Sequence, residues 1–143
     1  GSACNDFICH FLDLPPTILD MVNISKSETF QGTSLMPLFK GQTVKSRRKF
    51  VVSTYNGQQF GLYTQRMIRT EKWKYIWNTT DIDELYNLED DPYELNNIIN
   101  DNKYSELLIE LRQMLYFELL KDKDELVVGN DWMKRQLIDG KKI

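Results

Sequence analysis

Four polar side chains with the chemistry to bind a ligand gather around one short stretch of the sequence. Gly57 and Gly61 bracket polar amides in residues 56–61, a pattern typical of a turn or loop. The candidate ligand-binding residues in and beside it are Gln58, Gln59, Gln65 and Arg66. Amides together with a guanidinium can hold anionic or hydroxyl-rich ligands. The same residues could instead form a hydrogen-bonded turn with a salt-bridged arginine, and the sequence leaves both interpretations open.

The sequence gives little support for a nucleophile or a metal site. Cys4 and Cys9 form a CxxxxC pair without a second pair, whereas a structural zinc ion normally needs four ligands. A local disulfide is an alternative, but two buried or reduced thiols are favoured. His10 is the one histidine, so neither a two-histidine metal site nor a Ser-His-Asp triad is supported. The acidic run 81–91 contains no glycine, which disfavours a calcium loop.

The residues that must position the polar loop have the pattern of β-strands. Alternating β-branched residues predict a strand over 49–54, before the loop. After the loop, residues 64–70 and 72–78 form the clearest hairpin, with Glu71-Lys72 as the connecting turn. A further short extended piece covers 85–88, and the Asp-Pro pair that follows breaks it.

Three aromatic residues, Trp73, Tyr75 and Trp77, lie on one face of the second hairpin arm. Such rings could form a stacking platform for bases or sugars. On an alternating strand beside a terminal helix, a place in the hydrophobic core is favoured.

Helical spacing is strongest in the second half of the chain. Apolar residues recur at three- and four-residue steps over 103–120, with Asn102 as the predicted N-cap. A weaker helical pattern covers 131–138, and this tail could be an arm that reaches another surface. Several antiparallel strands followed by a terminal helix predict an α+β fold rather than a parallel α/β sheet.

The first third of the chain predicts short helical pieces. Pro15 and Pro16 can open a helix over 17–22, with Asp13 as its cap. Ser34 is predicted to cap a single turn that Gly41 closes.

The composition limits the classes of protein to which this chain could belong. The chain has 143 residues, 41% of them hydrophobic and 27% charged, which suits one globular domain. A net charge of −3 with mixed signs argues against a nucleic-acid partner, and the basic run 45–49 is interpreted as a solvated loop. No apolar stretch approaches the ~20 residues that cross a bilayer, so no membrane span is expected. The start lacks a secretory signal pattern, and residues 1–3 are interpreted as an expression scar.

Four blocks of sequence, in order, resemble the C-terminal subdomain of type I sulfatases, which are arylsulfatase-like enzymes of the alkaline-phosphatase-like superfamily. The blocks are FLDLPPTILDMVNI, GTSLMPLFKG, TQRMIRTEKWKYIWN and DELYNLEDDPYELNNI. Together they carry the resemblance from about Phe7 to Leu120. Pro16 and Asn87 are small departures from the family pattern.

The resemblance implies a small antiparallel sheet of about four strands with a long C-terminal helix packed across it. The expected division of the chain is therefore the expression scar at 1–3, the subdomain at 4–124 and a C-terminal tail at 125–143. Within the subdomain, a linking helix and turns would cover 4–46, the sheet 47–100 and the helix 101–121.

In similar sulfatases a larger N-terminal domain carries the chemistry. It holds a Cys- or Ser-x-Pro-x-Arg motif whose first residue becomes formylglycine, the calcium ligands, and the residues that bind sulfate. Neither Cys4 nor Cys9 is followed by Pro-x-Arg, so formylglycine and calcium are implied only for the parent enzyme. The resemblance therefore implies a piece that is inactive alone, packs on the catalytic domain and borders its cleft for a sulfated sugar or aryl ester. Gln58, Gln59, Gln65 and Arg66 are the cleft candidates.

Two alternatives remain open at this point. One is a stand-alone binding or interaction module derived from a sulfatase, and the other is the same piece of a phosphonate or phosphate ester hydrolase. An exposed apolar surface is also expected, because the residues that would cover the larger domain invite self-association in its absence. These residues are Leu12, Leu14, Ile18, Leu35 and Phe39.

Overall fold

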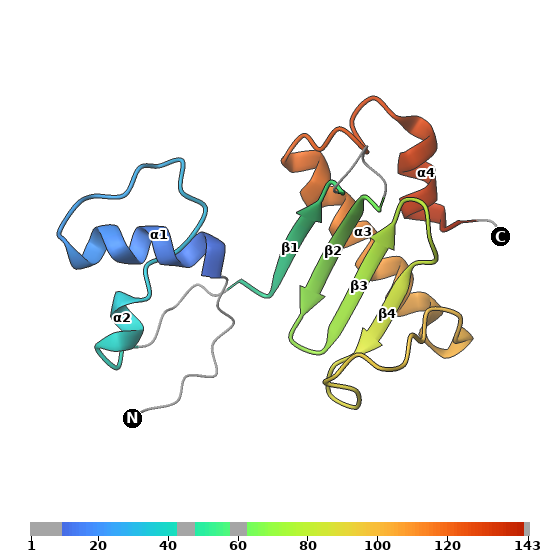
Figure 1. Cartoon of the computed structure of the whole chain (residues 1–143), viewed down its shortest axis with the longest axis horizontal. Coiled ribbons are helices and arrows are strands. Elements are labelled where there is room, and N and C mark those ends of the chain that lie inside the picture. The colour runs from blue at the N-terminus through green and yellow to red at the C-terminus, as the bar shows by residue number, and fades with distance from the viewer. Residues whose placement is uncertain (1–9, 43–47, 58–62, 142–143) are drawn as a thin grey trace. The chain divides into compact units, whose positions relative to one another are not determined.

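The computed structural model describes residues 10–42, 48–57 and 63–141 (Figure 1). It consists of two compact units, unit 1 from Gly1 to Lys49 and unit 2 from Phe50 to Ile143, and each is described by itself. The predictions for Cys4, Cys9, Gln58 and Gln59 lie outside the described residues.

Unit 2 is built on a four-stranded antiparallel sheet with the strand order β1-β2-β3-β4. The strands are β1 (Phe50–Tyr55), β2 (Gln65–Thr70), β3 (Trp73–Asn78) and β4 (Glu84–Asn87). Each strand follows its neighbour in the sequence, as short turns between antiparallel strands allow. The predicted hairpin is confirmed, since β2 and β3 pair antiparallel on either side of Glu71-Lys72.

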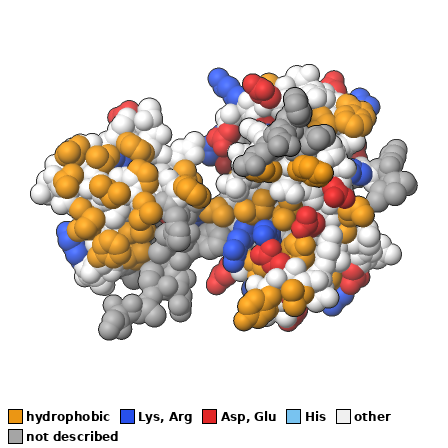
Figure 2. Space-filling view, viewed as in Figure 1, with side chains coloured by type: hydrophobic (Ala, Val, Ile, Leu, Met, Phe, Trp, Pro, Cys, Tyr) orange, Lys and Arg blue, Asp and Glu red, His pale blue; other side chains and the backbone are white. Residues whose placement is uncertain are grey.

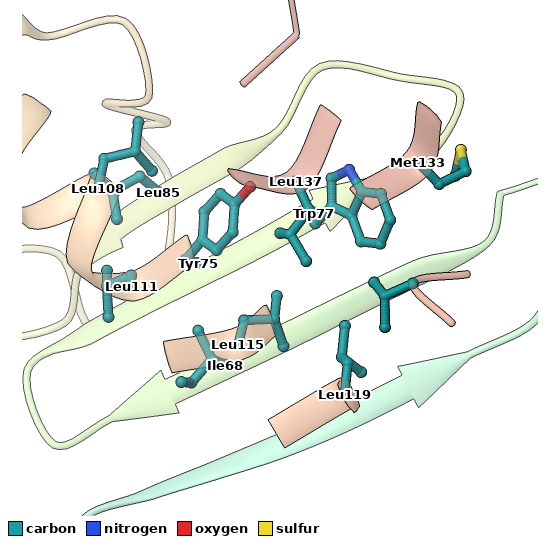
Figure 3. Packing of buried hydrophobic residues seen from close by; sticks show 11 residues of the cluster. Ile68, Tyr75, Trp77, Leu85, Leu108, Leu111, Leu115, Leu119, Met133 and Leu137 are labelled. Atoms are coloured by element: carbon teal, nitrogen blue, oxygen red, sulfur yellow. The ribbon is translucent and has the colours of Figure 1, made fainter. Parts of the chain in front are cut away.

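The long helix α3 (Ser105–Lys121) lies across one face of this sheet (Figure 1). Its leucines meet the inward-facing residues of the strands, which confirms the α+β fold class. Figure 3 shows Tyr75 and Trp77 among these leucines, and both rings are 0% exposed. The aromatic strand is therefore core, and its alternation places successive side chains on opposite faces of the sheet.

The predicted N-cap of the long helix is wrong. A 3₁₀ turn, η1 (Asn102–Tyr104), precedes α3, and the N-cap position of α3 is Tyr104, which makes no capping hydrogen bond with its side chain. The side-chain cap lies before the 3₁₀ turn instead, where the Asp101 carboxylate accepts from the Lys103 amide and satisfies a donor that the turn leaves free.

The tail forms helix α4 (Asp131–Asp139), capped by the Asn130 side chain on the Met133 amide. Met133 and Leu137 are 8% and 0% exposed and belong to the core cluster (Figure 3). Residues 131–139 therefore pack on α3 rather than extend as an arm, although Trp132 is 66% exposed.

Unit 1 contains α1 (His10–Met21) and the single turn α2 (Met36–Phe39). The predicted start of the first helix is wrong, because Pro15 and Pro16 lie inside α1 rather than at its beginning. A proline inside a helix leaves the carbonyl four residues earlier without its N–H donor. For Pro16 that carbonyl belongs to Leu12, and the chain at Gly32 passes so close to it that a Cβ would overlap.

Asp13 does not cap the helix, which corrects a second expectation. Its buried carboxylate accepts two hydrogen bonds from Arg48, at 2.5 and 2.9 Å, and one from the Thr33 amide at 3.0 Å. One turn on, Thr17 accepts from the Leu35 amide at 2.8 Å. These polar contacts fasten the loop before α2 to the inner face of α1.

The outward face of α1 is apolar, the reverse of the usual arrangement. Phe11, Leu14, Ile18 and Met21 are 94%, 46%, 57% and 60% exposed, at spacings that put them on one face. Figure 2 shows hydrophobic side chains gathered over the surface of unit 1. Of the remaining residues predicted for this surface, Phe39 is exposed and Leu12 and Leu35 are half-buried.

No helix among the described residues combines the length and apolarity that a bilayer crossing requires.

Candidate functional site

The candidate residues belong to one end of the sheet in unit 2, where β1 leads into β2. Gln58 and Gln59 fall between these strands but outside the described residues. Gln65 and Arg66 open β2 and are paired in register with Tyr55 and Thr54 of β1. Because successive residues of a strand point to opposite faces, Gln65 and Arg66 have different surroundings.

Gln65 is half-buried and held by its neighbour on β3. Its Nε2 donates to Asn78 Oδ1 at 2.6 Å. The buried Asn78 donates in turn through Nδ2 to the Ile82 carbonyl at 2.7 Å and to Glu84 Oε1 at 3.0 Å. The Gln65 amide is thus fixed in position by a network that also shapes the turn between β3 and β4.

Arg66 is 4% exposed and lies on the α3 side of the sheet. Its guanidinium makes a two-point ion pair with Asp124, with Nε–Oδ2 at 2.7 Å and Nη2–Oδ1 at 3.3 Å. Nη1 donates to the backbone carbonyls of Tyr55 and Gln65 at 3.2 and 2.8 Å. The structure therefore has Arg66 in the salt-bridged arrangement, where it ties the end of β1 to the start of β2.

A shallow hollow of about 200 Å³ lies on the opposite, outer face of the sheet. Its lining residues are Ser53, Tyr55, Gln65, Met67, Lys74 and Ile76. Lys74 is not a free cation, since its Nζ lies 2.5 Å from Glu94 Oε2. The hollow offers a hydroxyl, an amide and a half-exposed aromatic ring over an apolar floor, which is a mixture suited to binding a hydroxyl-rich ligand.

The described side chains that line the hollow include one aliphatic hydroxyl, Ser53, and no histidine. The single histidine of the chain is in unit 1, so Ser53 has no imidazole in unit 2 to act as its base. In the described part of the chain, no group of three or more His, Cys, Asp or Glu could hold a metal ion. The calcium ion implied by the sulfatase resemblance thus finds no ligand set there.

Sequence reasoning missed the two residues that organise this sheet end, Asp124 and Asn78. Asp124 meets Arg66 across 58 positions of sequence, and no local pattern joins the two. The sequence held a weak indication of the role of Asn78. It is a polar residue at the end of the aromatic strand, and a buried side-chain amide needs hydrogen-bond partners.

The fold and this sheet end define an α+β domain with a small hollow on the outer face of its sheet and, among the described residues, no group that could hold a metal ion. A family model described as N-sulphoglucosamine sulphohydrolase, C-terminal, matches residues 1–121. The chain belongs to this family of sulfatase C-terminal domains, and the resemblance to type I sulfatases is confirmed.

Two curated relatives show how much of a longer protein this chain represents. A Delta 4,5-hexuronate-2-O-sulfatase of Bacteroides thetaiotaomicron is 34% identical over 116 residues, which are 80% of this chain and 24% of that enzyme. A protein of Haemophilus influenzae is 31% identical over 131 residues, 92% of this chain and 65% of that protein. The chain thus spans about a quarter of the sulfatase but two thirds of the Haemophilus protein, which is the much shorter of the two.

Solved structures agree with the family. A 2-O GAG sulfatase superimposes with a TM-score of 0.72 at 33% identity, over 80% of this chain and 25% of that one. A second structure, of a protein in complex with its substrate D-glucosamine-2-N,6-O-disulfate, gives a TM-score of 0.68 at 29% identity, over 82% of this chain and 25% of that one. The phosphonate monoester hydrolase of Agrobacterium radiobacter shares the fold, with a TM-score of 0.65 at 21% identity over 77% of this chain and 24% of that one.

Proposed function

We propose that this chain is the C-terminal piece of a sulfatase, a hydrolase of sulfuric esters, and that it borders the substrate cleft of a catalytic region that it does not itself contain. The family match over residues 1–121 carries the proposal. The chain by itself is inactive, because attack on sulfur needs a nucleophile with a metal ion and cationic donors around the developing charge. Formylglycine and calcium would belong to the catalytic region.

The apolar face of α1 supports packing on that region. Four apolar side chains of this helix are between 46% and 94% exposed, while its polar residues Asp13 and Thr17 are buried. An amphipathic helix normally buries its apolar stripe, and within unit 1 the described residues leave this one exposed. The catalytic region of the same polypeptide is the occupant that we propose, since about three quarters of the sulfatase relative's length is not represented here.

The cleft-bordering role is assigned to the end of the sheet with the polar loop. Gln58, Gln59 and Gln65 are the residues that would contact the sugar or aryl part of the substrate. Arg66 would act indirectly, because its guanidinium is committed to Asp124 and to two backbone carbonyls. Amide groups bind hydroxyls and sulfate oxygens without requiring a charge, which suits a sulfated sugar.

The test uses a polypeptide that contains both the catalytic region and this chain. Gln59→Ala and Gln65→Ala should each raise KM for a sulfated disaccharide several-fold while kcat changes little, because these contacts are uniform binding contacts. Gln113→Ala is the matched control, since Gln113 is an exposed amide on α3, on the other side of the sheet. Unchanged KM in both site variants with normal thermal stability would remove the cleft role.

A second candidate function has one observation in its favour. The Haemophilus relative is short enough that this chain covers 65% of it, so proteins built largely of this domain exist. A stand-alone binding module would then be the function. The reading frame upstream of Cys4 separates the two, since a Cys- or Ser-x-Pro-x-Arg motif there supports the sulfatase piece. The phosphonate hydrolase alternative rests on shared fold alone and would be favoured by turnover of phosphonate esters in the complete polypeptide.

A further inference from the structure

The segment that follows α3, residues 122–141, lies beyond the family match, which ends at residue 121. It is nevertheless built into unit 2. Val127, Met133 and Leu137 are 4%, 8% and 0% exposed and complete the core cluster beside Leu119 and Trp77. We refer to residues 122–141 as the brace.

The first end of the brace is fastened to β2. Asp124 is held in place by its amide, which donates to the Leu119 carbonyl at 2.9 Å, and its Oδ1 accepts from the Leu126 amide at 2.9 Å. From there the carboxylate makes its two-point ion pair with Arg66, in which the side chains are 11% and 5% exposed. Such a charged, bidentate contact is both strong and geometrically specific.

The second end of the brace is fastened to the turn between β3 and β4. Lys141 Nζ donates to Asp83 Oδ1 at 2.9 Å and to the carbonyls of Asn78 and Asp81. An ammonium group has three N–H donors, so these three oxygens satisfy it. Asp83 is 5% exposed, and its charge is therefore compensated largely within the protein.

The Arg66–Asp124 ion pair and the hydrogen bonds of Lys141 lie at the same end of the sheet. Arg66 and Asn78 are on neighbouring strands, and Gln65 is the register partner of Asn78. The two connections at this end are also joined directly, because the Thr79 amide and hydroxyl both donate to the Thr64 carbonyl at 3.0 Å. The brace thus holds the stems of the β1–β2 connection at one point and the β3–β4 turn at another.

We propose that the brace positions this sheet end for ligand contact, with Asp124 and Lys141 as positioning residues that act through Arg66 and Asp83. The inference rests on the proposed function, in which the β1–β2 connection borders a substrate cleft. It adds a part of the chain that the family match does not include. A sulfated ligand would contact this sheet end, whose strands are held in position by the Arg66–Asp124 and Asp83–Lys141 ion pairs.

Amide hydrogen exchange of the whole chain tests the brace. Asp124→Asn keeps the shape of the side chain and removes its charge, and Lys141→Met keeps the aliphatic stem. Each should accelerate exchange of the Thr79 amide at least about tenfold relative to the Leu88 amide, as expected for local opening. The Leu88 amide, which donates to the Lys72 carbonyl at 2.7 Å, reports on the opposite end of the sheet.

Glu125→Gln is the matched control, because Glu125 is an exposed carboxylate next to Asp124 and should change neither amide. Equal acceleration at Thr79 and Leu88 would mean general destabilisation and would overturn the brace, as would unchanged exchange at Thr79. Lys141→Arg should restore slow exchange at Thr79.

Kinetic measurements distinguish the role of the brace from the proposed function. In the complete polypeptide, Asp124→Asn should raise KM with kcat unchanged. Local opening at Thr79 together with unchanged KM in Gln59→Ala and Gln65→Ala would overturn the cleft role and leave only the part of the inference in which Asp124 and Lys141 hold this sheet end in place.

Discussion

The hydroxyl of Tyr75 donates a hydrogen bond of 2.8 Å to Asp83 Oδ2 inside unit 2. Tyr75 is fully buried and Asp83 is 5% exposed. Arg112 approaches both groups, with its Nε 3.3 Å from the Tyr75 hydroxyl and its Nη2 3.6 Å from the Asp83 carboxylate. The middle ring of the aromatic strand therefore uses its one polar atom to stabilise a buried carboxylate rather than to meet a ligand.

Tyr75→Phe should lower the free energy of unfolding by about 2 kcal/mol, since a buried carboxylate loses a charge-assisted donor. The loss stays moderate because Asp83 still accepts from Lys141 and from the Asn78 amide. Urea unfolding followed by tryptophan fluorescence measures it. Tyr93→Phe is the control, because Tyr93 is 82% exposed and its hydroxyl should matter little. Equal stability of the two variants would contradict the prediction.

Two tyrosines should make the fold sensitive to alkali. Burial raises the pKa of Tyr75 well above its ordinary value of 10.0, and the charge of Asp83 adds to the shift. Burial and a hydrogen bond to Glu84 raise the pKa of Tyr86 to about 12. A phenol whose pKa is higher in the folded state holds its proton more tightly there. Its contribution to stability is therefore complete below the unfolded pKa and is lost as the pH rises through the folded pKa.

Unfolding free energy should accordingly stay level up to about pH 9 and fall between about pH 10 and 12. Tyr75→Phe should have a shallower decline, because one of the two shifted groups is gone. A spectrophotometric tyrosine titration checks the origin of the effect. If all tyrosines ionised together near their ordinary pKa, the explanation would fail.

The hairpin and the aromatic core strand could be predicted from the sequence because both follow from local alternation. Every second side chain of a strand points to the same face of the sheet. The positions of Trp73, Tyr75 and Trp77 on one face therefore follow from their spacing alone. The α+β class followed from the order of the predicted strands and the terminal helix, and the family followed from the resemblance that four short blocks carry.

The interior of α1 could not be predicted by the same means. Pro15 and Pro16 favour a helix start locally, but contacts with residues 32–35 and Arg48 allow the helix to run through them. The ion-pair partner of Arg66 could not be predicted from the sequence for a related reason. Asp124 lies in a segment without local signal, and only the folded chain brings the two charges together.

Gly32→Ala should unfold unit 1 or shift its loop, because the added Cβ would overlap the Leu12 carbonyl. Overpacking against backbone costs about 1–3 kcal/mol or more, since a carbonyl cannot move aside as a side chain can. Exchange of the Leu35 amide, which donates to Thr17 Oγ1, reports on this contact. Gly41→Ala is the comparison, since Gly41 has a φ of +70° with no described atom within 4 Å of a Cβ, and should cost about 1 kcal/mol. A larger effect at Gly41 than at Gly32 would contradict the prediction.

Asp13→Asn should destabilise unit 1 by about 3 kcal/mol, because it removes the charge from a buried, two-point ion pair with Arg48. Arg48 has 21% of its side chain exposed, which places the expected loss at the lower end for such pairs. Protection of the Thr33 amide, which donates to Asp13, should fall with it. Asp20→Asn serves as the control, since Asp20 is exposed and accepts a single bond from Ser34.

The apolar face of α1 should make the isolated chain self-associate. Ile18→Glu places a charge in the middle of the face formed by Phe11, Leu14, Ile18 and Met21, where burial against a second copy would be costly. Sedimentation velocity over a range of concentrations should show a concentration-dependent species in the unchanged chain and a monomer in Ile18→Glu. Ile109→Glu is the matched control, because Ile109 is 50% exposed on α3 in unit 2 and should leave association as it is. A chain that stays monomeric at high concentration, or equal effects of the two substitutions, would show that this face does not drive association. If a catalytic region covers this face, as proposed, the same Ile18→Glu change should lower the stability of a polypeptide that contains both parts.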